Sequence, residues 1–387
     1  MSAKTRKEVL ARLRRNYAKA RRSEEKTVLL DEACRVLGYH RKAAIRALNE
    51  KKEKPKAKAA PAVFGRPREY EASKLLPVLK TIWLCAQQPC GRRLAALMAD
   101  WVPAYEAEDR RLESGVREAL LRASPATLDR LLQGVRVQGG ATGTRPGSLL
   151  RKQIPIAGKV WDQSEAGYLE VDTVAMCGGL LQGTHVWMLD ATDYATAWVE
   201  VRAQWNRGQH ATVCSLEDVR QRLPFELRGL DADNGSEFLN GHVLAWCGER
   251  RPRVDLTRSR AYHKNDNAHI EQKNWTHVRQ WFGYERYDNL EVVELINELT
   301  RGALGQLQNY FLPNLKLLSK ERDEKGRMVR RYGPAQTPLE RVLASEQVSA
   351  AKKAELRKKK AKLNPFALQR QIEKELRVIE AKRRAKC

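Results

Sequence analysis

Three acidic side chains have the types and spacing needed to hold metal ions. Asp172 lies inside a strand-like segment, Asp233 closes another at "DADNG", and Glu271 stands in the first turns of an expected helix. Because strand ends of open α/β sheets gather at one edge, we expect the three carboxylates to converge there. Converging negative charges repel one another unless a cation joins them, and Mg²⁺ or Mn²⁺ takes such oxygen ligands. Two such ions, about 4 Å apart, stabilise the attacking and leaving oxygens of a phosphoryl transfer.

Asn234 and Gly235 follow the second carboxylate and provide a tight turn that would expose it. The tripeptide Asp-Asn-Gly on its own fits a Ca²⁺-like loop or a plain surface turn equally well. The metal-centre hypothesis therefore depends on Asp172 and Glu271 as much as on this turn.

The elements that must position these residues follow one another along the chain. Residues 167–176, 184–192 and 196–203 are rich in β-branched and aromatic residues, which predicts three strands joined by short turns. Helices and strands then alternate as helix 210–223, strand 225–235, helix 238–250, strand 253–259 and helix 267–282. The order βββαβαβα predicts a mixed α/β sheet, within a catalytic core at 161–290.

The N-terminal flank is expected to be helical. Residues 24–50 read as a helix, a turn and a second helix, and the outer face of the second carries Lys42, Arg46 and Asn49. Such a face suits a DNA-binding helix-turn-helix module at 1–50, although an ordinary helical hairpin is the alternative. In the basic linker at 51–70, Arg66 and Arg68 suit a narrow minor groove, but a plain linker fits equally well.

Further helices are expected on both sides of the core. Residues 71–135 predict a second helical DNA-binding module, in which Ser124 caps a helix that begins at Pro125, and a linker follows at 136–160. Residues 291–345 predict a C-terminal extension of helices and a small charged hairpin. The basic stretch 346–387 fits a solvated helix or a tail that folds on its partner.

The positive charge is concentrated at the two ends of the chain. The formal net charge is +25; residues 1–68 hold 21 Lys/Arg and 7 Asp/Glu, residues 351–387 hold 14 and 4, and residues 161–290 hold 14 and 19. Basic ends around an acidic centre favour double-stranded DNA as the partner, with a solubilising tail as the alternative.

The cysteines and the apolar runs bound the cellular setting. The 7 cysteines form no Cys-x-x-Cys motif, which predicts reduced thiols and no cysteine-based zinc site. No stretch has the pattern of a signal peptide or of a membrane span. We expect a cytoplasmic, nucleoid-associated protein without a membrane partner.

Three motifs resemble those of a known family. "EVDTV" at 170–174, "DADNGSEF" at 231–238 and "YHKNDNAHIEQKNW" at 262–275 resemble the signatures of integrase-core (DDE) transposases. This family includes the retroviral integrases and many bacterial insertion-sequence transposases. Between Asp233 and Glu271 lie 37 residues, a separation similar to the family's, and the likeness covers residues 165–285.

The resemblance implies a ribonuclease-H-like core with Asp172, Asp233 and Glu271 as ligands of two Mg²⁺ or Mn²⁺ ions. It also implies an enzyme that cleaves DNA strands at element ends and transfers the 3′-hydroxyl into target DNA. Because two ends must be joined, we expect a homo-oligomer on DNA. A metal-dependent nuclease without strand transfer and a catalytically silent DNA-binding protein are the alternative hypotheses.

The sequence departs from the family in two places. No His/His/Cys/Cys zinc domain of the retroviral kind precedes the core. The relatives carry a basic residue one turn after the glutamate, where this chain has Trp275, and Lys273 would point to the far side of an ideal helix. Besides Lys273, the candidate DNA contacts in this region are Lys264, Asn265 and Asn267.

Other polar residues near the motifs have supporting roles in this interpretation. Asp231, Asn234 and His269 are expected to lie beside the metal ligands and to orient them, and Glu237 is an alternative ligand. His263 and His269 suit hydrogen bonding or DNA contact better than they suit hard Mg²⁺, which prefers oxygen.

Overall fold

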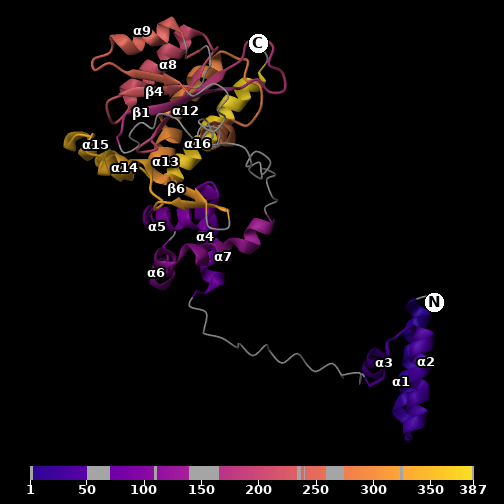
Figure 1. The fold of residues 1–387 in the computed structure, drawn as a ribbon. Helices are drawn as coiled ribbons and strands as arrows, with labels where there is room; N and C mark the ends of the chain where they lie inside the picture. Colours follow the sequence, from indigo (N-terminus) through magenta and orange to yellow (C-terminus); the bar gives the residue numbers. More distant parts are fainter. Residues whose placement is uncertain are drawn as a thin grey trace. The chain divides into compact units, whose positions relative to one another are not determined.

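Two compact units make up the chain, Met1–Arg68 and Glu69–Cys387, and each is described by itself (Figure 1). The computed structural model describes residues 3–49, 70–108, 111–138, 165–232, 237–238, 240–258, 274–322 and 326–385. Among the helices of these ranges, none joins the length to the apolar composition that a bilayer crossing demands.

The first unit consists of three helices around a small apolar core. They are α1 (Ala3–Lys19), α2 (Ser23–Leu37) and α3 (Arg41–Asn49). Gly38 ends α2 with a φ of 67°, a left-handed conformation that glycine adopts without strain. In α3, Ala44 and Leu48 are buried, whereas Ile45, which lies about 100° around the helix from Ala44, is 38% exposed.

A mixed five-stranded sheet forms the centre of the second unit, in the order β3-β2-β1-β4-β5. The strands β1 (Tyr168–Ala175), β2 (Trp187–Asp193) and β3 (Val199–Gln204) form two antiparallel pairs, β1 with β2 and β2 with β3. The strands β4 (Gly229–Ala232) and β5 (Asp255–Arg258) run parallel to β1 and follow α8 (Gln209–Arg222) and α9 (Gly241–Glu249). The expected mixed α/β sheet is confirmed.

Two asparagine side chains close the outer edge of β3. Asn297 of α12 (Glu291–Arg301) exchanges two hydrogen bonds with the backbone of Ala203, at 2.7 and 3.0 Å. Asn309 of α13 (Ala303–Phe311) does the same with Val199, at 2.9 and 2.8 Å. These amides satisfy backbone groups that an edge strand would otherwise leave open.

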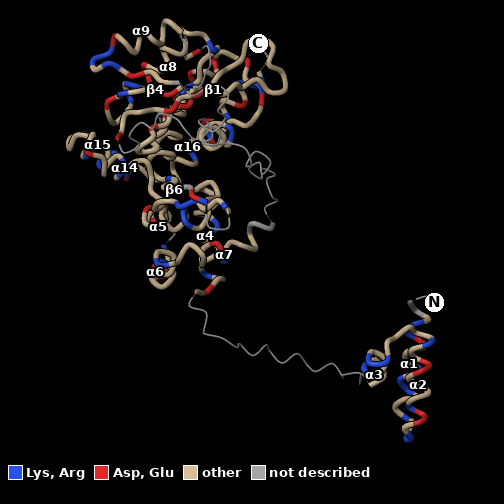
Figure 2. Tube along the Cα trace, in the orientation of Figure 1, with Lys and Arg blue, Asp and Glu red and all other residues tan. Residues whose placement is uncertain are grey.

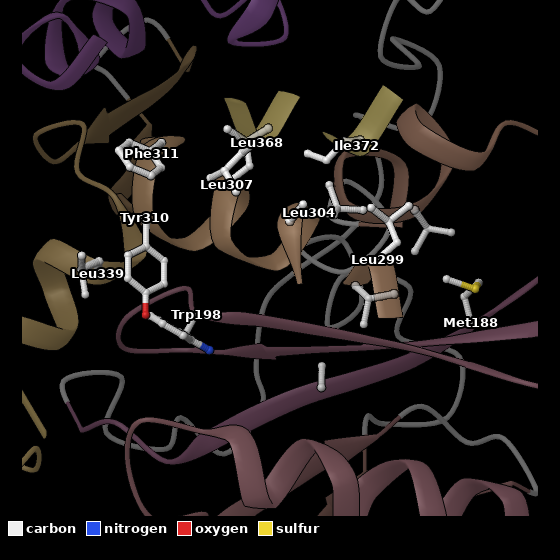
Figure 3. Packing of buried hydrophobic residues seen from close by; sticks show 14 of the residues in the cluster. Met188, Trp198, Leu299, Leu304, Leu307, Tyr310, Phe311, Leu339, Leu368 and Ile372 are labelled. Carbon is white, nitrogen blue, oxygen red and sulfur yellow. The ribbon is translucent and has the colours of Figure 1, made fainter. Parts of the chain in front are cut away.

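Helices from the C-terminal part cover one face of the sheet, and Figure 3 shows the apolar side chains between them. α15 (Ala350–Ala361) buries only Leu356, whereas α16 (Pro365–Arg384) is an integral part of the core. The expectation of a solvated helix is wrong for α16, and the helix packs within this chain rather than waiting for a partner. Its Leu368, Ile372 and Ile379 recur at helical spacing among the lysines and arginines, and they form a buried stripe.

The helices α4 (Ala72–Cys85), α5 (Gly91–Glu106), α6 (Ser114–Arg122) and α7 (Pro125–Gln138) belong to the same unit as the sheet. The Oγ atom of Ser124 accepts the Thr127 N–H at 3.2 Å, which confirms the predicted cap of α7. On α5, the Trp101 Nε1–H donates to the carbonyl oxygen of Phe311 at 3.2 Å, and the Trp101 ring meets Phe366 edge-on at 5.1 Å. The helical module is thereby tied to α13 and α16.

A hairpin and a short helix complete the second unit. β6 (Leu317–Arg322) and β7 (Met328–Tyr332) pair antiparallel, as the sequence predicted, and Gly326 has a φ of 71°. α14 (Pro338–Ala344) begins with a capping box between Thr337 and Glu340.

Candidate metal centre at the sheet edge

Asp172 lies on β1, beside Ala232, the last described residue of β4. Its half-buried carboxylate accepts the Thr173 N–H at 2.7 Å and the Asn274 Nδ2–H at 2.6 Å. In the parallel register, Val171 pairs with Ala232, the last residue of β4. Asp172 therefore lies inside the first strand, as predicted, one residue beyond the position paired with the last residue of β4.

Asn274 begins a helical segment that is hydrogen-bonded to this part of the sheet. It precedes the short π-helix η1 (Trp275–Arg279), which continues into α11 (Gln280–Phe282). Within the described residues, the buried Oδ1 atom of Asn274 has no hydrogen-bond donor. An oxygen acceptor beside a carboxylate, left without a donor, is the kind of ligand that a hard cation takes.

Two further contacts fix η1 on the sheet. The His277 Nδ1 atom lies 3.1 Å from Oδ2 of Asp190 on β2, and the Arg279 Nη2–H donates to the Ala175 carbonyl oxygen at 2.6 Å. Burial lowers the pKa of Arg279 from its usual value, but the backbone carbonyl gives its guanidinium a polar partner. Asp172 and Asp190 are direct partners across β1 and β2, so their side chains share one face of the sheet.

Asp231 supports β4 through two neighbouring hydroxyl groups. Its two carboxylate oxygens accept the Tyr194 hydroxyl at 3.0 Å and the Thr257 hydroxyl at 2.7 Å. Its Cα partner on β1 is Glu170, a buried acid. In Figure 2, acidic residues accordingly gather around β1 and β4. The hydroxyl donors suit Asp231 to orienting the strand that leads to Asp233.

Glu237 sits on the opposite side of β1. Its Oε1 atom accepts the Thr173 hydroxyl at 2.8 Å, and successive side chains of a strand alternate between faces, so Thr173 points away from the Asp172 side. The side chain is 2% exposed, and Arg207 Nε lies 3.5 Å from Oε2, an ion pair without hydrogen-bond geometry. Glu237 thus forms an ion pair with Arg207 and a hydrogen bond with Thr173. Both lie on the side of β1 opposite to Asp172.

The predicted DNA-facing residues of α3 lie on its outer side. Lys42, Arg46 and Asn49 are all exposed, and in the described part of the chain no acidic side chain pairs with Lys42 or Arg46. Unpaired cations on one helix face, with the apolar residues turned inward, are compatible with a helix that lies in a DNA groove.

Comparison with known proteins identifies one relative of nearly full length. No family model matches the chain. The uncharacterized protein y4rM of Sinorhizobium fredii (strain NBRC 101917 / NGR234) is 36% identical over 353 residues, which cover 88% of this chain and 96% of the relative. The chain belongs to the y4rM family. The second unit, Glu69–Cys387, makes up less of the chain than the 88% that the alignment covers. The alignment therefore includes part of the first unit as well.

Several predicted site residues of this y4rM-family chain lie outside the described residues. They are Arg66, Arg68, Asp233, Asn234, His263, Lys264, Asn265, Asn267, His269, Glu271 and Lys273. In the ranges that the structure describes, no group of three His, Cys, Asp or Glu side chains is placed to hold a metal ion. The metal centre therefore stays a prediction, and of its three carboxylates only Asp172 lies among the described residues.

Three residues around Asp172 were not predicted from the sequence, namely Asn274, His277 and Asp190. Asn274 and His277 stand three and six residues after Glu271, a spacing that repeats along a helix face and was a usable signal. Asp190 follows the apolar run "VWML". Only the antiparallel register between β1 and β2 reveals that it lies opposite Asp172.

Proposed function

We propose that the chain is a DDE-type transposase, a metal-dependent polynucleotidyl transferase that cleaves element ends and joins the 3′-hydroxyl to target DNA. The observation that carries the proposal is Asp172 on β1, hydrogen-bonded to Asn274 and adjacent to the parallel strand β4. The strand order β3-β2-β1-β4-β5, with β4 and β5 parallel to β1, supports a ribonuclease-H-like core.

The sequence places the other two carboxylates next to residues that the structure locates beside Asp172. Asp233 directly follows Ala232, whose Cα partner on β1 is Val171. Glu271 precedes Asn274, which donates to Asp172, by three residues. This proximity in the sequence supports taking both as ligands in the proposal.

The donor set fits hard divalent cations. Asp172, Asp233 and Glu271 would supply carboxylate oxygens, and the buried Oδ1 atom of Asn274 is one more acceptor without a donor in the described residues. Two Mg²⁺ or Mn²⁺ ions, when bound, supply electrostatic stabilisation of the oxygens that attack and leave phosphorus. The chain's own share is to orient Asp172 through Asn274 and the Thr173 N–H, and to brace β4 through Asp231.

The charges outside the core favour DNA as the substrate. The exposed face of α3 suits a major groove, and Arg357, Lys358 and Lys362, on and next to α15, are exposed without an acidic partner among the described residues. Because strand transfer joins two element ends, we include a homo-oligomer on DNA in the proposal.

The test uses duplex DNA from the flanks of the gene, with and without a pre-cleaved 3′-hydroxyl end, in Mg²⁺ or EDTA. We expect Mg²⁺-dependent cleavage and joined products from the wild type, and neither from Asp233→Asn at unchanged DNA binding. Cleavage without joining of the pre-cleaved end would identify a nuclease. Identical products, or none, from wild type and variant with intact binding would identify a silent DNA-binding protein.

A charge-neutralised variant tests the role of the basic C-terminal surface. The triple change Arg357→Gln, Lys358→Gln and Lys362→Gln leaves the buried residues untouched, and we expect weaker DNA binding. The slope of log K against log salt should shrink by about 0.9 for each phosphate that the variant no longer neutralises. Arg370→Gln serves as the control for a surface cation, because Arg370 already pairs with Glu108. An unchanged slope in the triple variant would show that these three residues contribute to solubility and not to DNA binding.

A further inference from the structure

Asp190 is a fully buried carboxylate one strand away from Asp172. Its side chain is 0% exposed, at the middle of β2, and its Cα partners are Asp172 on β1 and Val201 on β3. Burial of a carboxylate is costly unless the charge is paired and hydrogen-bonded. The sheet therefore needs a partner for Asp190 at this point.

That partner is His277 on η1. The His277 Nδ1 atom lies 3.1 and 3.4 Å from the two oxygens of Asp190, and the Thr192 hydroxyl donates to one of them at 3.3 Å. A proton on Nδ1 serves this contact in both the neutral and the charged imidazole. The carbonyl oxygen of His277 accepts from the Gln308 side chain at 3.5 Å, which adds a link to α13.

The contact continues a row along η1. Asn274 donates to Asp172, His277 donates to Asp190, and Arg279 donates to the Ala175 carbonyl oxygen. Side chains of one helical segment thus bond to the carboxylates of Asp172 and Asp190, which are cross-strand partners on β1 and β2. The segment is a π-helix, a rare and wide turn that is frequent at functional sites.

We propose that the Asp190–His277 pair is a positioning device that sets the rotation and height of η1 above the sheet. It holds Asn274 on Asp172. His277 and Asp190 are positioning residues, because they act through Asn274. The catalytic consequence of this inference rests on the proposed function.

The first arm of the test compares His277→Ala with His277→Asn, whose amide offers a donor near the Nδ1 position. In His277→Ala we expect hydrogen exchange in residues 274–282 to quicken about tenfold or more, while α5 and α13 exchange as before. We expect the apparent affinity for Mn²⁺ alone, measured by calorimetry, to fall about 10- to 100-fold. The kcat should drop about 10²-fold at nearly constant KM for DNA. His277→Asn should recover most of each effect, and the exposed His210→Ala should show none.

The second arm separates positioning from stability. His277→Ala strands a buried charge, whereas the double variant Asp190→Asn/His277→Ala removes that charge and should regain thermal stability. We expect the double variant to keep the fast exchange of 274–282 and the weak Mn²⁺ binding. Recovery of both together with stability would overturn the proposal, as would wild-type exchange in His277→Ala. If the wild type makes no DNA product, the proposed function fails, and exchange and Mn²⁺ affinity still decide on the positioning role.

Discussion

Asp172→Asn should lower the rate of DNA cleavage and joining by about 10³-fold, a loss of roughly 4 kcal/mol of transition-state stabilisation. The substitution removes one charged ligand and leaves the shape of the side chain. The amide oxygen of the new residue still accepts from Asn274, while its NH2 group faces the Thr173 N–H, so η1 should be retained at the loss of one hydrogen bond. Product formation in Mg²⁺ and calorimetric Mn²⁺ affinity measure the effect.

The same variant should be about as stable as the wild type. Asp172 and Asp190 are direct cross-strand partners, and like charges at such positions oppose each other, so neutralising Asp172 offsets the hydrogen bond lost at the Thr173 N–H. We expect the free energy of unfolding to change by less than about 1 kcal/mol. Asp288→Asn, which changes an exposed acid paired with Arg286, is the control and should leave the activity intact. A near-wild-type rate in Asp172→Asn would refute the metal centre.

Phe366→Ala should lower the free energy of unfolding of the second unit by about 3–5 kcal/mol. Phe366 is 6% exposed at the start of α16 and meets Trp101 and Tyr105 edge-on, at 5.1 and 5.9 Å between ring centroids. Its removal opens a cavity between α5 and α16, so the destabilisation exceeds the transfer free energy of the ring alone. Urea unfolding followed by tryptophan fluorescence measures the change.

Val378→Ala is the matched control on the same helix, because Val378 is 47% exposed. Its effect should stay within about 0.5 kcal/mol. Equal stability of Phe366→Ala and the wild type would mean that α16 is a dispensable tail. A deletion of 351–387 is unsuited to a test of DNA binding, because it removes core residues together with the surface charge.

The sheet could be predicted from the sequence because its strands have strong local signals. β-branched and aromatic residues, short turns, and the later alternation of strands with helices predicted each strand of the described sheet, with ends that differ by a few residues. At the start of the helical extension predicted at 291–345, residues 291–311 form two helices, because the chain turns at Gly302, whose φ is −98° and ψ is −117°. Local periodicity does not reveal such a break when apolar residues continue on both sides.

The remaining differences come from tertiary packing. α1 is so rich in arginine and lysine that its inward-facing Leu13 formed no clear pattern, yet it completes the first core. The buried stripe of α16 was hidden in the same way. At the candidate site, Asp172 could be predicted from its motif, but its hydrogen bond with Asn274 and the neighbouring Asp190–His277 pair depend on how η1 lies on the sheet.

The asparagines that close β3 restrict how copies of this chain can associate. An exposed edge strand lets a second protein extend the sheet through main-chain pairing, but Asn297 and Asn309 already occupy the backbone of Ala203 and Val199. Two subunits therefore cannot share a continuous sheet across β3 without displacing α12 and α13. If copies of the chain associate through this side, the interface must therefore form between side chains. Such an assembly can dissociate without breaking main-chain hydrogen bonds of the sheet.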